Sequence, residues 1–190
     1  QRQMCIRDSM DGKIEGMFDG GPCAVGVEST IIDLTCTPPR LLRPGGLPLE
    51  ALEAVLGHVD VDKAVVSLLK DGERPKAPGM KYRHYAPKAP VTVVTGDPEA
   101  SARYIQTHLP EGAGVICFTE YKDLFPGRSI HDLGPAADKE EQARRVFDAL
   151  REFDHEAVTE IYAQCPDTAG LGLAVANRLK KAAGFHVIEV

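Results

Sequence analysis

The second half of the chain alternates two kinds of apolar pattern. Short runs rich in β-branched residues predict strands, and longer runs with apolar residues at helical spacing predict helices. The predicted strands are residues 91–95, 114–119, 129–133, 160–164 and 185–190, and the predicted helices are residues 98–109, 137–156 and 171–183. Because alternating strands and helices build a parallel sheet that is covered on both faces, residues 91–190 predict a three-layer parallel α/β domain.

The first part of the chain has shorter elements. Residues 24–34 are apolar and β-branched and predict a strand, and residues 40–43 predict a second, short strand that stops at Pro44-Gly45-Gly46. Pro48 then opens a helical pattern at residues 49–56, which a glycine follows, in the order that helix ends favour. A piece of about 60 residues buries too little surface to be secure alone.

Residues 69–90 interrupt the periodic pattern and predict a linker, because four prolines and two glycines exclude regular structure. Inert linkers are rich in glycine and serine, whereas this one places two cations and three rings close together. We expect these side chains to dock as a lid, with Lys81 facing a polyphosphate, Tyr82 and Tyr85 stacking or hydrogen bonding, and His84 facing an anion. A solvated loop is the alternative.

Composition narrows the class of protein. The 190 residues are 43% hydrophobic with a net charge of −6, and no apolar run approaches the length that a membrane span needs. We therefore expect an ordered protein without a membrane segment. Five cysteines without metal-type spacing, in a sequence without a recognisable secretory leader, indicate a reducing compartment, so the expected location is cytoplasmic.

Charge is unevenly divided along the chain. Residues 1–90 hold 12 basic and 12 acidic side chains, whereas residues 91–190 hold 10 and 16. The stretch from Lys70 to Lys88 is locally cationic. Duplex nucleic acid needs a broad basic face, so we expect weak or no direct duplex binding. The short cationic stretch suits one small polyanion better.

The first nine residues show no apolar period and no helix cap, and they resemble the translation of a sequencing-library adapter. We therefore leave them out of the fold prediction. We also expect the natural protein to begin further upstream, so that this chain starts within a domain.

Glu28, Ser29 and Thr30 interrupt an otherwise apolar stretch. Buried polar groups need hydrogen-bonding partners. These residues therefore predict either an edge strand with one solvated face or the polar floor of a pocket, in which the two hydroxyls bind a ligand. No Gly-x-Ser-x-Gly sequence surrounds Ser29, which disfavours a nucleophilic serine.

Arg43 ends a predicted strand just before two glycines and a helix start. A guanidinium near glycine amides and a helix N-terminus suits a phosphate or a carboxylate. An ordinary surface arginine before a turn fits the same pattern, so both interpretations stay open.

Three further patterns favour structural roles over chemistry. Residues 58–62 alternate a histidine and two aspartates with valines, which suits metal ligands less well than the solvated face of a strand. Cys165 precedes a proline and has no evident base, so we interpret it as structural. Gly170 and Gly172 lack the third glycine of a dinucleotide-binding loop and fit a tightly packed helix start.

Four segments occur in an order that is similar to one known family. They resemble the two-domain form of threonylcarbamoyl-adenylate synthase, also called threonylcarbamoyl-AMP synthase, and Gly170–Leu179 resembles its C-terminal domain. The resemblance covers residues 10–190, and the linker motif is its most specific part. The four segments are Asp19-Gly20-Gly21-Pro22, Gly26–Asp33, Leu42-Arg43-Pro44-Gly45 and Ala77–Pro87.

The resemblance implies an activity, in which L-threonine, bicarbonate and ATP yield threonylcarbamoyl-AMP and pyrophosphate. ATP would be a substrate accompanied by Mg²⁺, and downstream tRNA-modification machinery would take the product. No catalytic residue and no protein-bound metal is expected, because positioning and charge neutralisation would carry the reaction. The residues implied are Ser29 for threonine, Arg43, Tyr82 and Tyr85 for ATP, and Glu28, Thr30, Lys81 and His84 for the pocket or its lid.

The same resemblance implies how the chain is divided. Residues 1–9 are the adapter-like segment, residues 10–68 the C-terminal fragment of a twisted α/β catalytic domain, residues 69–90 the linker arm, and residues 91–190 a complete three-layer, Rossmann-like parallel α/β domain. Because most of the catalytic domain is absent, we expect this chain to lack the synthase activity of its full-length parent. The alternative is a non-enzymatic module that binds a nucleotide or regulates a partner.

Overall fold

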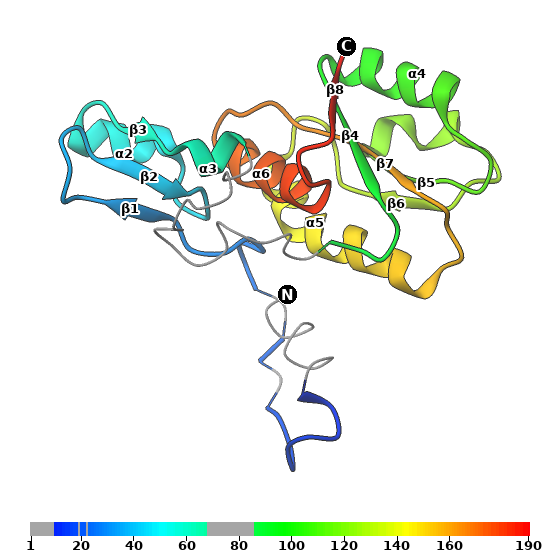
Figure 1. The fold of residues 1–190 in the computed structure, drawn as a ribbon, viewed down its shortest axis with the longest axis horizontal. Helices are drawn as coiled ribbons and strands as arrows, with labels where there is room; N and C mark the ends of the chain where they lie inside the picture. The colour runs from blue at the N-terminus through cyan, green and yellow to red at the C-terminus, as the bar shows by residue number, and fades with distance from the viewer. Residues whose placement is uncertain (1–9, 19, 22, 68–85) are drawn as a thin grey trace.

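The computed structural model describes residues 10–18, 20–21, 23–67 and 86–190, which form two parts lying side by side (Figure 1). The larger part contains a five-stranded sheet with helices on both faces, and the smaller part contains a three-stranded sheet. Most of the predicted linker lies outside the described residues.

The five-stranded sheet is parallel throughout, in the order β6-β5-β7-β4-β8. The alternating sequence pattern predicted its strands and its three connecting helices, with small differences at their ends. The strands are β4 (Val91–Thr95), β5 (Gly114–Cys117), β6 (Ile130–Asp132), β7 (Ile161–Gln164) and β8 (Val187–Glu189). The helices are α4 (Pro98–His108), α5 (Lys139–Glu152) and α6 (Gly172–Ala182).

Successive residues of the central strands point to opposite faces of this sheet, and each face has its own apolar core. Val93 of β4 and Ile116 of β5 belong to the core formed with α5 and α6. Val94 and Val115 belong to the core formed with α4. Because these strands are buried on both faces, they appear in the sequence as continuous apolar runs.

The sequence did not predict the two short 3₁₀ helices of the larger part. One of them, η1 (Thr119–Leu124), joins β5 to β6, and the other, η2 (Phe153–His155), follows α5. The helix expected over residues 137–156 begins at Lys139, since the Asp138 side chain accepts a hydrogen bond from Glu141 N and caps the helix there.

The smaller sheet has the order β1-β2-β3, with β1 antiparallel and β3 parallel to β2. The prediction of a strand over residues 40–43 and of a helix over residues 49–56 is confirmed. Gly57 ends that helix with a φ of 76°. The elements are β1 (Ile31–Asp33), β2 (Arg40–Arg43), α2 (Leu49–Leu56), β3 (Asp60–Val61) and α3 (Lys63–Val66).

The strand predicted over residues 24–34 is wrong for most of its length, because only Ile31–Asp33 pairs with β2. Gly26 has a φ of 81°, which interrupts an extended strand. Further along, the carbonyl of Glu28 accepts a hydrogen bond from Gly46 N. The polar segment before β1 therefore runs as an irregular chain beside the end of β2.

Helix α6 lies between the two sheets and holds them together (Figure 1). Asn177 Nδ2 donates to the Val65 carbonyl at 2.6 Å, and Gly170 N, just before the helix, donates to Glu50 Oε1 at 3.0 Å. A third contact between the two parts pairs an arginine of α6 with Glu28. These contacts join α2, α3 and the polar segment to one helix of the larger part.

The smaller part leaves apolar side chains exposed. Leu34, Val55 and Val66 are 63%, 83% and 63% exposed, and α2 has no buried residue. In the described parts of the chain, no helix is long and apolar enough to cross a bilayer. The uncovered surface is of the kind that packs against further protein.

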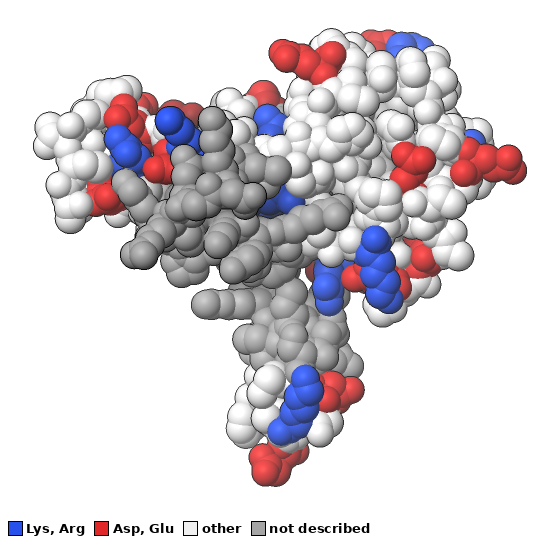
Figure 2. Space-filling view, viewed as in Figure 1, with Lys and Arg blue, Asp and Glu red and all other residues white. Residues whose placement is uncertain are grey.

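Charged side chains of both signs are intermixed over the two parts (Figure 2). Among the described residues, the face in view shows no broad basic surface of the kind that duplex nucleic acid needs. Weak or absent duplex binding stays a prediction.

Candidate functional site

The pairing of β1 with β2 brings together two residues that the sequence singled out. Ser29 precedes β1 and is exposed, and Arg43 is the last residue of β2. In the antiparallel register, Ile31 lies opposite Arg43, so the segment before β1 passes beside the Arg43 side chain. Ser29 and Arg43 therefore lie at the same end of the smaller sheet.

Arg43 binds both the main chain and the side chain of Ser29. Its Nε and Nη2 atoms donate to the Ser29 carbonyl at 3.1 and 2.9 Å, and Nη2 also donates to Ser29 Oγ at 3.0 Å. The serine hydroxyl accepts this last bond, so its own proton can be donated to a ligand. A guanidinium beside such a hydroxyl suits a carboxylate or a phosphate.

The turn after Arg43 packs directly on the polar segment. A Cβ atom at Gly45 would lie 2.2 Å from the Glu28 carbonyl oxygen, and Gly46 N donates to that same oxygen at 3.0 Å. Thr30 Oγ1 donates to the Leu47 carbonyl at 2.8 Å and accepts from Leu47 N at 2.9 Å. The glycines thus allow a close approach of two backbones, and the Gly46 amide, one of the amides on which an anion site would depend, is bonded within the chain.

Glu28 binds a residue that the sequence analysis missed. Its Oε2 atom lies 2.6 Å from Nε of Arg178, which belongs to α6 and is 5% exposed. Arg178 also donates from Nη2 to the Pro44 carbonyl at 3.3 Å and from Nη1 to Asn177 Oδ1 at 2.8 Å. A residue far along the chain therefore contacts both the polar segment and the turn after β2.

Little in the sequence indicated this buried polar group on α6. Asn177 and Lys181 are 2% and 6% exposed, like Arg178. Basic residues near a helix C-terminus are usually solvated and stabilise the helix dipole. In the sequence, Asn177, Arg178 and Lys181 fall on one side of α6, like the solvated face of an amphipathic helix, so the pattern carries no sign of their burial.

Among the described residues, three basic side chains of this site (Arg43, Arg178 and Lys181) lie near one carboxylate, that of Glu28. The pKa of Lys181 is lowered to about 8, mainly because the side chain is buried. The nearby charges of Arg178 and Arg43 lower this pKa further, whereas Glu28 opposes them. Three basic groups near one carboxylate favour an anionic ligand.

Four of the predicted site residues lie outside the described residues, so their docking as a lid stays a prediction. They are Lys81, Tyr82, His84 and Tyr85.

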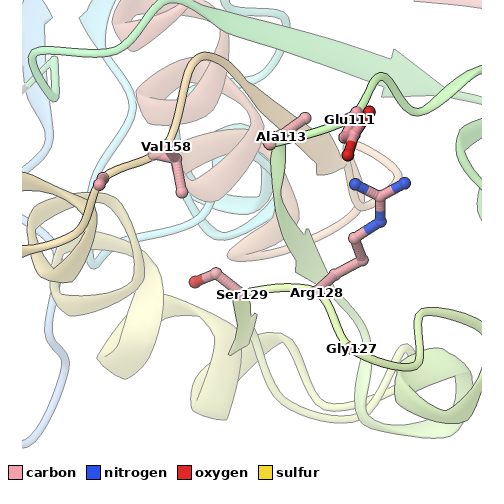
Figure 3. A pocket seen from close by; sticks show the side chains of 8 residues that line it. Glu111, Ala113, Gly127, Arg128, Ser129 and Val158 are labelled. Carbon is pink, nitrogen blue, oxygen red and sulfur yellow. The ribbon is translucent and has the colours of Figure 1, made fainter.

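Two hollows open elsewhere on the described surface, and several of the polar groups that line them have partners within the protein. One, of about 610 Å³, lies at the amino ends of β5, β6 and β7 (Figure 3). Its Arg128 donates to the Pro110 carbonyl at 3.0 Å, and its Ser129 binds Glu156. The other, of about 560 Å³, lies near the start of α5, where Lys139 pairs with Asp167 at 2.9 Å. Neither hollow includes Ser29 or Arg43.

Parallel α/β folds bind nucleotides at the carboxyl edge of the sheet. In the large sheet, the side chain of Gln164 lies at this edge and is bonded within the protein. This side chain is fully buried at the end of β7. Its Oε1 accepts from Phe118 N at 3.0 Å, and its Nε2 donates to the Pro98 carbonyl at 2.7 Å and to Ser101 Oγ at 2.9 Å. These bonds join β7 to the end of β5 and to α4.

Gly170, just before α6, and Gly172, its first residue, serve the helix start, as the sequence suggested. Gly170 has a φ of 57°, which glycine adopts without strain, and a Cβ at Gly172 would lie 2.1 Å from the Asp167 carbonyl. Cys165 is 3% exposed, and burial raises the pKa of its thiol to about 12, which fits a structural role.

Residues 58–62 also have structural contacts. Asp60 pairs with Arg40 at 3.7 Å, and Asp62 caps α3 by accepting from Ala64 N at 3.0 Å. In the described part of the chain, no group of three or more His, Cys, Asp or Glu residues is arranged so that it could hold a metal ion.

Residues 47–184 match the family model described as "Threonylcarbamoyl-AMP synthase, C-terminal domain". Curated proteins named threonylcarbamoyl-AMP synthase from Bacillus subtilis (strain 168) and from Pyrococcus abyssi are 43% and 46% identical to this chain. Each alignment covers 97% of this chain, and 53% and 54% of the respective relative. The chain therefore spans about half the length of the curated relatives it matches.

Solved structures show the same similarity. A crystal structure of P. abyssi Sua5 complexed with L-threonine matches with a TM-score of 0.79 and 42% identity, covering 97% of this chain and 54% of that chain. A variant of the same protein matches with a TM-score of 0.86 and 43% identity, covering 99% and 54%.

Proposed function

Because the chain belongs to the threonylcarbamoyl-AMP synthase family, whose C-terminal-domain model covers residues 47–184, we propose that it forms part of an enzyme that makes threonylcarbamoyl-AMP. The substrates would be L-threonine, bicarbonate and ATP, and pyrophosphate would leave. Since the chain spans about half the length of its relatives, we assign this activity to a longer protein that contains these residues.

The observation that carries the proposal is the direct contact of Arg43 with the Ser29 carbonyl and hydroxyl. We assign Ser29 to threonine and Arg43 to ATP, and one similar structure is of a protein complexed with L-threonine. Two contacting residues with different ligands would bring those ligands next to each other. Such proximity lowers the barrier of a reaction between two substrates.

The chemistry proposed needs no covalent intermediate with the protein. The threonine amine and bicarbonate form a carbamate with loss of water, and a carbamate oxygen attacks the α-phosphorus of ATP while pyrophosphate leaves. Ser29 would orient threonine, and the Arg43 guanidinium would neutralise phosphate charge. Mg²⁺ would accompany ATP through the phosphate oxygens, since the described site offers basic groups rather than several carboxylates.

The linker residues complete the proposed ATP site. Tyr82 and Tyr85 would contact ATP, with Lys81 and His84 beside them in the lid. Replacing Tyr85 by alanine in the longer protein is expected to raise the KM for ATP while residues 86–190 stay folded. Unchanged kinetics would make the linker a passive spacer.

Substrate-specific kinetics test the assignments of Ser29 and Arg43. One lost hydrogen bond corresponds to about a three- to tenfold change, so Ser29→Ala is expected to raise the KM for threonine by about that factor and to leave the KM for ATP nearly unchanged. Arg43→Gln is expected to affect ATP more. Arg103→Gln, which removes an exposed pair with Glu99, is the matched control. A Ser29→Ala enzyme with an unchanged threonine KM would overturn the assignment.

The alternative, a non-enzymatic nucleotide-binding or regulatory module, has less support, because the Gln164 side chain at the carboxyl edge of the large sheet is buried and bonded within the protein. Titration with a non-hydrolysable ATP analogue separates the two. Binding that needs both threonine and Arg43 supports the synthase, whereas threonine-independent binding by residues 86–190 supports the module.

Delivery of the product to tRNA-modification machinery and a cytoplasmic location are part of the same proposal. The resemblance to the synthase family implies the first, and the cysteine pattern supports the second.

A further inference from the structure

Arg178 contacts the residue next to each of the two proposed ligand-binding residues. Its Nε atom binds the carboxylate of Glu28, which precedes Ser29, at 2.6 Å. Its Nη2 atom binds the carbonyl of Pro44, which follows Arg43, at 3.3 Å. One guanidinium from α6 therefore holds both backbone segments that carry the proposed site.

The orientation of this guanidinium is itself fixed. Asn177 Oδ1 accepts from Arg178 Nη1 at 2.8 Å, and Asn177 Nδ2 donates to the Val65 carbonyl of α3 at 2.6 Å. With Arg178 only 5% exposed, the three nitrogens of its planar fork each face a protein acceptor. Lysine carries a point charge and cannot reproduce this fork.

Other bonds already join the two segments to each other. Gly46 N donates to the Glu28 carbonyl, Thr30 binds the Leu47 backbone, and Arg43 binds Ser29. The smaller sheet therefore has local contacts that do not involve α6. What Arg178 adds is the position of both segments relative to α6.

We propose that Arg178 is a positioning residue, which holds Ser29 and Arg43 in the geometry that binds threonine and ATP by anchoring Glu28 and Pro44 to α6. This inference rests on the proposed function, and it gives helix α6 of the larger part a role in positioning the site. Breaking the anchor would let the substrate-binding edge shift while the five-stranded sheet stays intact.

Steady-state kinetics of the longer protein distinguish positioning from folding. Arg178→Met is expected to raise the KM for threonine and for ATP about tenfold or more. The variant removes the hydrogen bonds to Glu28 and Pro44 that fix Ser29 and Arg43 relative to α6. Arg178→Lys is expected to recover only part of this loss. Glu28→Gln is expected to act in the same direction, with a double variant no worse than the worse single variant.

The control variant is Arg103→Gln, which is expected to leave both KM values within about twofold. If Arg178 serves folding alone, fewer active molecules would lower the apparent kcat and leave KM unchanged, and that result would overturn the proposal. Where Arg178→Met does not fold, Arg178→Lys and Glu28→Gln decide by the same criterion.

Hydrogen exchange in the 190-residue chain tests the anchor without any activity. The Gly46 amide, which donates to the Glu28 carbonyl, is expected to exchange about tenfold faster in Arg178→Met. The Val115 amide of β5, which donates to the Ser129 carbonyl, is expected to keep its wild-type rate. Wild-type exchange at Gly46 would overturn the proposal. A longer protein without threonine-dependent pyrophosphate release would instead overturn the proposed function, and the exchange result would still decide whether Arg178 anchors the segment.

Discussion

Lys181 and Arg178 lie on neighbouring turns of α6, and they are 6% and 5% exposed. The pKa of Lys181 is lowered to about 8, mainly by burial and further by the nearby charges of Arg178 and Arg43. The unfolded chain therefore binds the lysine proton more tightly than the folded chain does. Between about pH 8 and the ordinary lysine pKa, the free energy of unfolding gains a contribution that rises with pH.

Replacing Lys181 by methionine is expected to raise the stability of the protein more, relative to wild type, at pH 7 than at pH 10.5, because the charged form of the lysine is disfavoured in its buried site. This gain should shrink as the pH rises from 8 to 10.5, where the folded wild type has already lost the proton. Urea denaturation of both proteins at several pH values measures the difference directly. Lys180→Met, which changes the less buried neighbour, controls for the loss of a positive charge.

The quantity to follow is the difference between the unfolding free energies of wild type and Lys181→Met at each pH, since other groups also titrate in this range. Burial raises the pKa of the Cys117 and Cys165 thiols to about 12, so both proteins lose stability in alkali as these thiols ionise in the unfolded chain. That effect is common to wild type and variant and cancels. A stability difference that stays constant from pH 7 to 10.5 would contradict the burial argument.

Single residues also show how far the sequence could lead. Ser29 and Arg43 could be singled out by residue type, since polar groups in an apolar stretch need hydrogen-bonding partners, which a ligand can supply. Their mutual contact could not, because it depends on the β1–β2 register. Arg178 could not be chosen either, because its partner lies 150 residues away.

At the scale of elements, the pattern worked where strands are buried on both faces. β4, β5 and β7 are continuous apolar runs, and their alternation with helices predicted the parallel sheet. The pattern did not predict the structure of residues 24–34. There the positive φ of Gly26 interrupts the extended chain, and the Glu28 carbonyl is bonded to the turn after β2 instead of to a strand. The strand order of the sheet was beyond the pattern, since it depends on contacts between distant segments.

The turn after β2 gives a prediction at this scale. Gly45→Ala is expected to destabilise the smaller sheet by about 1–3 kcal/mol, because the new Cβ would lie 2.2 Å from the Glu28 carbonyl oxygen, within a backbone that cannot rotate away. Urea denaturation followed by circular dichroism measures the loss. Gly16→Ala, at a site with no atom within 4 Å of the added Cβ, is expected to be neutral. Equal stabilities of the two variants would show that the close approach does not constrain the turn.

At the scale of the whole molecule, helix α6 of the larger part also contacts the smaller part, and the two parts differ in how well their apolar surfaces are covered. The five-stranded sheet is covered on both faces, whereas the smaller part exposes Leu34, Val55 and Val66 and leaves α2 without a buried residue. The relatives are about twice as long as this chain. We propose that the exposed apolar surface packs against the further part of a longer protein, and that activity requires it.

The net charge of −6 is unevenly distributed over the molecule. The acidic excess lies in residues 91–190, whereas residues 1–90 are neutral and include Arg43 and the cationic linker. An acidic total is therefore compatible with an ATP site formed by the other half, because exposed charges farther away than about 10 Å are largely screened.

ATP-dependent pyrophosphate release in the presence of threonine and bicarbonate is the most direct measurement of the proposed activity. The longer protein that contains these residues is expected to release pyrophosphate only when all three substrates are present, and the 190-residue chain alone is expected to release none. Release by the longer protein that does not depend on threonine, or turnover by the 190-residue chain, would contradict the assignment.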